Sequence, residues 1–564
     1  MLRTALALSL YLLGASVLAQ SCPPQEGKSL LWGDLHVHTI YSLDAYAFGA
    51  VATPQDAYAF ARGQPLRLAN GEEQQIDRPL DFVAVTDHAE TFDQMYLCTD
   101  PEFRDNGYCQ GLRTARDAKD ARRLFNDNLL PVVAGQPPQQ PEVCHGQSAG
   151  CALAAQRQWR RIQEAANQAN TPCEFTALIG YEWTASPGGR HWHRNVIYAS
   201  DKVPSEAFDY VRFPTVDALW KQLDQHCRPE QGCNVLTIPH NLNWTDGGPT
   251  FAAETEAPEI TALRTRYERL AEMHQEKGNS ECLPQDPAST ACKFERVREN
   301  SARSRLSPPP ASPEAGWRAA RSGYYRTLLG RGLKATANGS NPYMLGAVGS
   351  TDTHLGLPGW VQEASYRPLT ALFLTDEQTL KNTAYNPGGL VAVWADENTR
   401  AGVFEALARR ETYATSGPRI KLRFGASNVD VCKQANPQAQ VNMGGTIGDA
   451  MTQPWFSVQA ARDAQKIARV EVVKASYWAG ALTEQVVELA TYKNGVDTVC
   501  LSWQDPGYNP AAPAFYYARV LEQPSPRWSK LMCEAGDLCD KYPQADQMIQ
   551  ERAWSSPIWR LPSN

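Results

Sequence analysis

The residues of this sequence with the clearest capacity for chemistry are histidines and carboxylates that follow short apolar runs. The first such stretch, LWGDLHVHTIYSLDA (residues 31–45), holds His36 and His38 with one residue between them, and Asp44 six residues later. Successive side chains of a strand point to opposite faces, so the two imidazoles share a face and could bind one metal ion. Taken alone, an HxH pair is more often two half-exposed histidines, so its meaning depends on what accompanies it.

Four further apolar runs end in the same kinds of side chain. They are DFVAVTDHAE with Asp87 and His88, TALIGYEW with Glu182 and the nearby His191 and His193, NVLTIPHN with His240, and LGAVGSTDTH with Asp352 and His354. Of the 10 histidines, only His145, His226 and His274 lie clearly outside this pattern. Imidazole and carboxylate without a converging cysteine favour zinc, iron or manganese over a structural thiolate site.

These side chains must be brought together by the elements that carry them. Between residues 30 and 425, apolar or β-branched runs alternate with helical segments, a pattern typical of parallel βα units. The predicted strands are 30–37, 81–87, 175–183, 194–199, 234–240, 345–352 and 369–374, and the predicted helices include 152–169, 264–278 and a segment within 397–417 that Asn398 or Thr399 can cap. In a βα barrel the carboxyl ends of the strands meet at one face, where active sites are built.

Two regions depart from this alternation. Residues 279–320 are rich in proline, serine and charge, and we interpret them as an insertion or loop. After residue 426 the predicted strands 466–478, 484–492, 497–503 and 514–522 are separated by turn-forming residues. The sequence therefore predicts a barrel over residues 20–425 and a small antiparallel β module over residues 426–564, packed on the barrel.

The amino terminus indicates export. Arg3 precedes an apolar run over residues 5–17, and small residues lead to Ala19, so residues 1–19 are interpreted as a signal peptide cut near Ala19. Cys22 invites a lipoprotein interpretation, but the preceding AQS lacks the expected leucine, so lipidation is not favoured. No other run is long enough to span a bilayer. We expect a periplasmic protein, and its net charge of −7 argues against nucleic acid as the partner.

The 14 cysteines fit an oxidising compartment. Many form close pairs, and loop-closing disulfides are expected for Cys98/Cys109, Cys144/Cys151, Cys227/Cys233, Cys282/Cys292 and Cys533/Cys539, with Cys432/Cys500 as a further possible pair.

In chain order, GDLHVHTIYSLDA, VAVTDHAE, GYEW…HRNVIY, IPHN and GSTDTH resemble the motifs of the PHP superfamily, named for polymerase and histidinol phosphatase domains. YEWTASPGG, ENTRAGVFEALARRETYATSGPR and ERAWSSPIW resemble a branch of exported members of largely undefined function. The resemblance covers nearly the whole mature chain. It implies an α/β fold, a distorted (β/α)7 TIM-like barrel, with two or three divalent ions of zinc, manganese or iron and usually phosphoesterase activity.

Carried over residue by residue, the resemblance assigns ligands to three ions. They are His36, His38 and Asp352 for the first, His193 and His240 for the second with Glu182 bridging the two, and His88 and His354 for the third.

The third ion is the uncertain one. Many relatives carry a further histidine after HxH, whereas this sequence has Asp44, a plausible oxygen ligand, which leaves the occupancy and identity of that ion open. His191 competes with His193 for the second ion, and the position of His193 in HRNV favours it.

Two neighbouring ions would lower the pKa of a bridging water and hold both the attacking and the leaving oxygens of a phosphoryl group. Beside the ligands Glu182 and Asp352, Asp87 is the expected catalytic group, either orienting a ligand or moving a proton. Arg194 could clamp a phosphate or form an ion pair, and Asn241 could bind substrate or finish a turn. The expected substrate is a small anionic ester, and the sequence carries no signal of oligomeric state.

Three alternatives stay open. An amidohydrolase barrel also opens with HxH, but that class usually bridges its metals with a carbamylated lysine, where this sequence has Glu182. A sulfate or phosphonate ester hydrolase could use the same scaffold. A non-catalytic binding barrel would be expected to have lost ligands, and here the set is complete.

Overall fold

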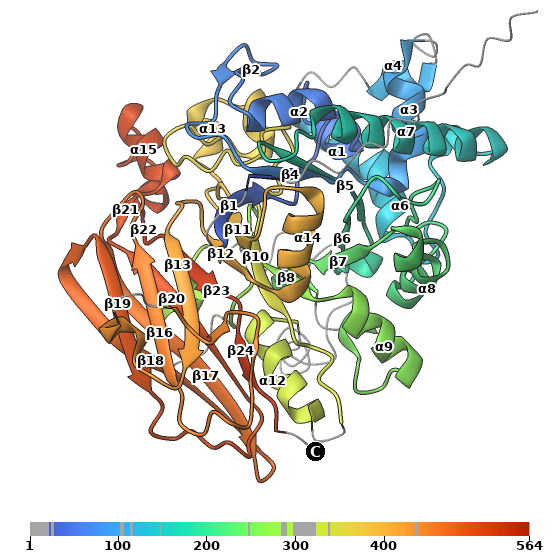
Figure 1. Cartoon of the computed structure of the whole chain (residues 1–564). Helices are drawn as coiled ribbons and strands as arrows, with labels where there is room; N and C mark the ends of the chain where they lie inside the picture. The colour runs from blue at the N-terminus through green and yellow to red at the C-terminus, as the bar shows by residue number, and fades with distance from the viewer. Residues whose placement is uncertain are drawn as a thin grey trace, which may run out of the picture.

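The computed structural model describes residues 22–23, 27–101, 107–112, 117–146, 148–245, 249–283, 290–296, 323–336, 339–434 and 438–562 (Figure 1). The predicted signal peptide lies outside the described residues, as does most of the segment 284–320.

The central feature is a mixed sheet of 13 strands. The part of it that concerns the site has the order β12-β11-β1-β4-β5-β6-β7. These strands are β12 (Thr412–Thr415), β11 (Leu390–Ala395), β1 (Ser29–Asp34), β4 (Phe82–Val85), β5 (Thr176–Trp183), β6 (Arg194–Tyr198) and β7 (Val235–Pro239). Strands β1, β4 and β5 are parallel, whereas β6 and β11 run antiparallel to both of their neighbours.

A second, three-stranded sheet lies beside the first. Its strands β8 (Leu270–Gln275) and β10 (Gly346–Gly349) are parallel, and β8 forms a hairpin with β9 (Gly278–Asn279). The isolated bridges Val37–Thr353 and His88–Glu182 continue the pairing beyond the strand ends. The ends of β1, β4, β5 and β10 therefore meet in one region.

The expected closed (β/α)7 TIM-like barrel is wrong. Across the described ranges, no ladder of hydrogen bonds joins the three-stranded sheet to the large sheet, so the strands do not close into a barrel. The physical reason is that the βα repeat is not kept. Residues 184–193 return the chain from β5 into an antiparallel β6 without a crossover helix, and β11 pairs with β1 antiparallel. In addition, the predicted strand 369–374 is a 3-10 helix, Leu369–Phe373.

The α-helices surround these sheets (Figure 1). They are α1 (Leu43–Ala47), α2 (Pro54–Ala61), α3 (Phe92–Thr99), α4 (Gly107–Leu112), α5 (Ala118–Leu124), α6 (Leu130–Ala134), α7 (Ser148–Ala169), α8 (Val216–His226), α9 (Pro258–Tyr267), α12 (Tyr325–Thr336), α13 (Asp376–Thr379), α14 (Arg400–Arg409) and α15 (Trp528–Ala535). The predicted helix 152–169 is confirmed within α7, and Thr399 caps α14 by accepting a hydrogen bond from the amide of Gly402.

The predicted helix 264–278 is wrong after Tyr267. The helix α9 ends there, and the chain enters β8, whose six residues are all buried. The composition of LAEMHQ favours a helix, but a strand enclosed on both faces is selected by packing rather than by propensity. His274, which was expected in a loop or helix, lies on β8 against the rings of Phe294 and Trp554.

The predicted antiparallel strands after residue 426 are confirmed. A four-stranded sheet contains β13 (Lys421–Ser427), β14 (Val441–Asn442), β16 (Trp455–Ala461) and β19 (Thr498–Gln504). The strands β15 (Thr446–Ile447), β17 (Ile467–Trp478), β18 (Ala481–Val496), β20 (Ala514–Glu522), β23 (Arg552–Ser555) and β24 (Ile558–Arg560) belong to the 13-stranded sheet. Two small ribbons are β2 (Leu66–Arg67) with β3 (Glu73–Gln74), and β21 (Ser525–Pro526) with β22 (Met548–Ile549).

The C-terminal strands thus continue the central sheet. Strand β23 pairs with both β12 and β20. The orange-to-red strands β16 to β20 lie to one side of the central strands in Figure 1. The part of the chain after residue 426 is joined to the rest by a ladder as well as by packing.

Seven disulfides are formed, and all six pairings anticipated from the sequence are confirmed. The seventh, Cys22–Cys173, joins the amino terminus to the turn before β5 and engages the sulfur that a lipid anchor would need. No helix in the described residues is long and apolar enough to cross a membrane. These features fit an extracellular or periplasmic protein.

Candidate metal centre

Six histidines and three carboxylates meet where the strands β1, β4, β5, β7 and β10 end. They are His36, His38, His88, His193, His240, His354, Asp44, Glu182 and Asp352, and each is less than 10% exposed. His193 belongs to the group because β6 is antiparallel to β5, so the start of β6 lies beside the end of β5. Asp44 comes from the first turn of α1.

Glu182 lies at the centre of the cluster and its two oxygens face different histidines. Oε1 is 2.8 Å from His193 Nδ1 and 3.2 Å from His240 Nε2. Oε2 is 3.4 Å from His36 Nε2 and 3.3 Å from His38 Nε2. A carboxylate divided in this way has the geometry of a bridging ligand between two ions, the role that the resemblance implies.

Asp352 and Asp44 complete two further groups. Asp352 Oδ1 lies 3.2 Å from Nε2 of both His36 and His38. Asp44 Oδ2 lies 3.2 Å from Nε2 of both His88 and His354. Four sets of residues in this centre have ligand atoms within 4.8 Å of one another. They are His36/His38/Asp352, His36/Glu182/His240, His38/His88/His354 and Glu276/Asp352/His354.

The outer nitrogens of the two HxH imidazoles are held by polar side chains. His36 Nδ1 lies 3.0 Å from the buried carboxylate of Glu272 on β8. His38 Nδ1 lies 2.9 Å from Ser42 Oγ, which donates its own proton to Asp87 Oδ1. In both cases the outer nitrogen can donate a proton to its partner while Nε2 is directed at the centre, the orientation found in metal-binding histidines.

Three other imidazoles are oriented in the same way. One nitrogen of each ring contacts a polar group of the protein: His88 Nδ1 lies 2.6 Å from Thr184 Oγ1, His193 Nε2 2.7 Å from Ser186 Oγ, and His354 Nδ1 2.8 Å from the carbonyl of Asp352. The same Nδ1 atoms lie 3.3 Å from Glu182 in His88 and 3.4 Å from Glu276 in His354. Each ring therefore turns its second nitrogen toward a carboxylate of the cluster.

The buried carboxylates and imidazoles of the centre shift one another's pKa values. Burial alone would raise the pKa of Asp44, Glu182 and Asp352, but the neighbouring imidazoles, joined at Asp352 by the Lys277 ammonium, hold all three pKa values well below their ordinary range. Burial lowers the pKa of His88, but the carboxylates of Asp44 and Glu182 have the larger combined effect and raise that pKa to about 9.

The residues present fit divalent ions. His38 Nε2 and Asp352 Oδ1 are 3.2 Å apart, and neither atom has a hydrogen-bond partner. With neutral imidazoles the buried carboxylates would carry an uncompensated negative charge, which is costly unless cations are bound. Zinc, manganese and iron accept both imidazole nitrogen and carboxylate oxygen, so the ligand types match.

Of the two histidines that compete in GGRHWHRN, the structure brings His193 to the cluster. His191 Nδ1 faces the side-chain amide of Asn241 at 3.3 Å, and its ring stacks on His193. Its contacts support the ring of His193 and are not directed at Glu182.

Asp87 is fully occupied by protein donors. It accepts hydrogen bonds from the backbone amide and hydroxyl of Thr39 and from the hydroxyl of Ser42. Of the two expected roles, this geometry supports orientation of His38 through Ser42 rather than transfer of a proton to substrate.

Arg194, which the sequence predicts as either a phosphate clamp or a partner in an ion pair, forms an ion pair. Its side chain is wholly buried, with Nε 2.8 Å from Glu268 and two other nitrogens donating to the carbonyls of Trp192 and Thr250. No nitrogen is left to reach a substrate at the cluster.

Asn241 finishes a turn under strain. Its φ is 54°, in the left-handed region, and its Oδ1 accepts a hydrogen bond from the side chain of Gln275. Asp352 has a similar φ of 55°. Non-glycine residues with such angles concentrate at functional sites, where the surrounding structure holds them in place.

Sequence reasoning missed the contribution of β8 and the turn after it. This segment supplies Glu272, Gln275, Glu276 and Lys277, of which Lys277 forms an ion pair with Asp352 Oδ2 and lies 3.2 Å from Glu276. The side chain of Lys277 is 17% exposed, against 1% for Asp352, so it faces the outer side of the cluster. The sequence predicts a helix over residues 264–278 and therefore does not place these side chains at a strand end. Recognising a short strand that ends in polar residues would have located them.

The sequence matches one protein family, described as "Protein of unknown function (DUF3604)", over residues 25–495 and 489–562. No curated protein and no solved structure matches.

Proposed function

This chain belongs to the DUF3604 family, a family of unknown function. From its site we propose that it is an exported, metal-dependent hydrolase of small anionic esters, with phosphoesters as the preferred substrate class. The proposal includes kinship with the PHP superfamily, which rests on the motifs alone. The observation that carries it is the orientation of the imidazoles, five of which turn one nitrogen outward to a protein partner and the other inward to the carboxylates.

His36, His38 and Asp352 would hold one ion, His193 and His240 a second, with Glu182 between them, and His88, His354 and Asp44 a third. When bound, neighbouring divalent ions supply an activated water and neutralise charge on the oxygens of the ester.

The chain's own residues would complete the site. The Lys277 ammonium, on the outer side of Asp352, would bind an anionic oxygen of the ester, the first of the two roles considered for Arg194. Asp87 and Glu272 act through other residues, since they hold His38 and His36 in the tautomer that binds a cation.

Lys277 also bears on the amidohydrolase alternative. A carbamylated lysine forms from a neutral amine, but burial lowers the pKa of Lys277 less than Asp352 and Glu276 raise it, so the amine stays charged. The ion-paired lysine therefore supports the ester hydrolase over a lysine-bridged amidohydrolase.

The test is metal analysis of the purified full-length protein, with hydrolysis of an aryl phosphate, a phosphodiester, an aryl sulfate and an aryl phosphonate. We expect at least two bound or reconstitutable ions per chain and turnover of at least one phosphoester, with loss of both in the His36→Ala/Glu182→Ala double variant. In Lys277→Met the KM should rise by about tenfold or more while the metal content stays unchanged. A protein that binds no metal, or whose activity survives the double variant, would refute the proposal.

A further inference from the structure

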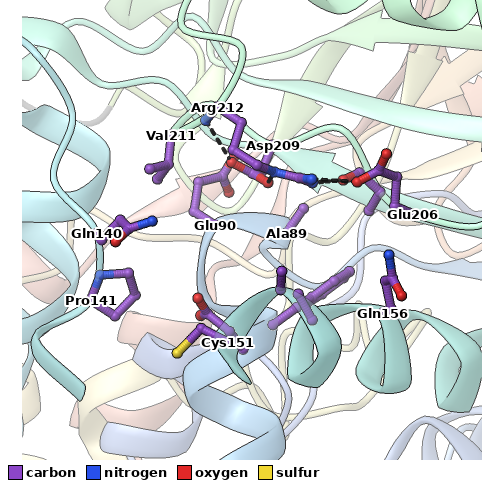
Figure 2. A pocket seen from close by; sticks show the side chains of 15 residues that line it. Ala89, Glu90, Gln140, Pro141, Cys151, Gln156, Glu206, Asp209, Val211 and Arg212 are labelled. Atoms are coloured by element: carbon purple, nitrogen blue, oxygen red, sulfur yellow. Dashed lines mark hydrogen bonds and ion pairs between the residues drawn. The ribbon is translucent and has the colours of Figure 1, made fainter. Parts of the chain in front are cut away.

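A cavity of about 70 Å³ lies outside the metal centre, between the start of α3, helix α7 and the loop 206–212 (Figure 2). Glu90 and Asp209 form its buried side, at 3% and 8% exposure, whereas Gln140 and Gln156 at its rim are exposed. The cavity therefore has an acidic inner end and a mouth that opens to solvent.

Glu90 has one oxygen that is engaged and one that is not. Oε1 accepts hydrogen bonds from the backbone amides of Thr184 and Tyr210, both at 2.9 Å. Oε2 is buried and has no hydrogen-bond partner. A buried carboxylate oxygen without a donor is unfavourable, so this atom is suited to a ligand that can donate to it.

Asp93, one turn further on, is half-buried and likewise has one oxygen engaged by a backbone amide. Its Oδ1 accepts a hydrogen bond from the amide of Gln94 at 2.6 Å. Its Oδ2 lies 3.2 Å from Sγ of Cys144, which is disulfide-bonded to Cys151 and has no proton to donate. The disulfide also prevents these sulfurs from acting as thiolate metal ligands.

The remaining charges on the cavity wall do not neutralise these two acids. Arg212, the one cation among the described lining residues, forms ion pairs with Asp209, at 2.6 Å, and Glu206 (Figure 2). Arg212 also lowers the pKa of Asp93 at a distance, but its ion pairs on this wall are with Asp209 and Glu206 and not with Glu90 or Asp93. Burial raises the pKa of Asp93 to about 7, which reflects the same lack of compensation.

The shape and chemistry of the cavity favour an ammonium group over a bare metal ion. In the described part of the chain, Glu90, Asp93 and Asp209 do not form a set whose ligand atoms lie within 4.8 Å of one another, so they do not converge on one ion. Phe92, Ala155 and neighbouring alanines supply an apolar wall, and the volume corresponds to about two water molecules. We propose that this cavity binds the ammonium end of a small primary amine, whose N–H groups donate to Glu90 and Asp93.

The site would be connected to the metal centre. Glu90 holds the amide of Thr184, and the hydroxyl of Thr184 lies 2.6 Å from Nδ1 of His88. An amine bound at Glu90 would therefore change the hydrogen bonding of Thr184, the residue that orients His88 in the proposed third metal site.

The test is calorimetric titration of the full-length protein with methylammonium chloride, with sodium chloride and tetramethylammonium chloride at equal ionic strength. We expect saturable binding of methylammonium alone, because tetramethylammonium has no N–H to donate and is larger. Glu90→Gln, which keeps the acceptor for the two backbone amides, should weaken binding by about tenfold or more.

Asp93→Asn provides a second variant and should also weaken binding, whereas Asp201→Asn, at an exposed carboxylate outside the cavity, should leave it unchanged. Absence of methylammonium binding would show that the cavity takes no cationic ligand, and equal binding by the Glu90 and Asp93 variants would show that the amine binds elsewhere. Either result would overturn the proposal. Equal binding of sodium would overturn it in favour of a metal ion. None of these readouts depends on hydrolysis, so the result is independent of the proposed function.

Discussion

Asp44 is the residue at which this centre differs from the histidine-rich pattern implied by its motifs. Its Oδ2 is equidistant, at 3.2 Å, from His88 and His354, and it is buried in the first turn of α1. In the proposed third metal site, an oxygen ligand in place of nitrogen would favour a harder ion such as manganese.

Replacing Asp44 with Asn should therefore remove one ion selectively. Asn keeps an oxygen but loses the negative charge that balances the two imidazoles, so we expect the metal content to fall by about one ion per chain, with the ions near Glu182 retained. Metal analysis of the purified variant measures this, with Asp201→Asn as control. An unchanged metal content would show that Asp44 is not a ligand.

The raised pKa of His88 predicts that metal binding releases protons. In chelated protein this imidazole, with a pKa of about 9, holds a proton at neutral pH, and a metal ion binds only the neutral ring. Binding at neutral pH should thus release a proton and tighten as the pH rises toward 9, above which the release disappears.

Calorimetry in buffers of different ionisation enthalpy measures this proton release. His88→Ala should reduce it, whereas His226→Gln, at an exposed helix residue, should not. A pH-independent affinity without proton release would contradict the prediction.

At the scale of elements, β10 shows how closely the two sheets approach without pairing. A Cβ at Gly349 would lie 2.9 Å from the carbonyl oxygens of both Leu390 and Thr415, on β11 and β12. This strand leads directly to Asp352, so its separation from the large sheet sets the position of that carboxylate.

Gly349→Ala should therefore both destabilise the protein and disturb the centre. Because backbone atoms must move to admit the methyl group, we expect a loss of about 1–3 kcal/mol in the free energy of unfolding and a weaker affinity for metal. Thermal and denaturant unfolding measure the first effect and metal titration the second. Gly448→Ala, where a Cβ meets open space, is the matched control, and equal behaviour of the two variants would contradict the argument.

At the scale of the whole molecule, Glu281 joins the C-terminal strands to the segment after β9. Its wholly buried carboxylate lies 2.7 Å from a nitrogen of Arg519 and of Arg326, and accepts hydrogen bonds from Tyr517 and Trp554. These partners come from α12, β20 and β23, so residues far apart in sequence depend on one charge.

Glu281→Gln should destabilise the fold strongly because it removes the one buried carboxylate that Arg326 and Arg519 share, and leaves each arginine with a single acidic partner, Glu484 and Glu471 respectively. We expect a loss of about 3–5 kcal/mol in the free energy of unfolding. Glu484→Gln, which removes a partner of Arg326 that is 34% exposed, should cost about 1 kcal/mol or less. Small and similar losses of unfolding free energy in both variants would show that the Glu281 network does not hold the C-terminal strands to the segment after β9.

Several features of this protein were determined by the sequence itself. Short apolar runs that end in His, Asp or Glu located β1, β4, β5, β7 and β10 and the side chains at their ends, because a short run of strand-forming residues and its end are local properties. Short cysteine spacings identified five disulfides, since neighbouring residues close small loops. The turn-separated runs after residue 426 identified antiparallel strands for the same local reason.

The tertiary structure alone decided the rest, because it depends on contacts between distant segments. It placed a strand at 270–275 where the residue types favour a helix, and so brought Glu272 and Lys277 to the centre. It left the sheets unclosed, since the direction of β6 and β11 is set by pairing partners rather than by their own residues. It paired Cys22 with Cys173 and Arg194 with Glu268, and it decided which oxygen of Glu182 faces which histidine.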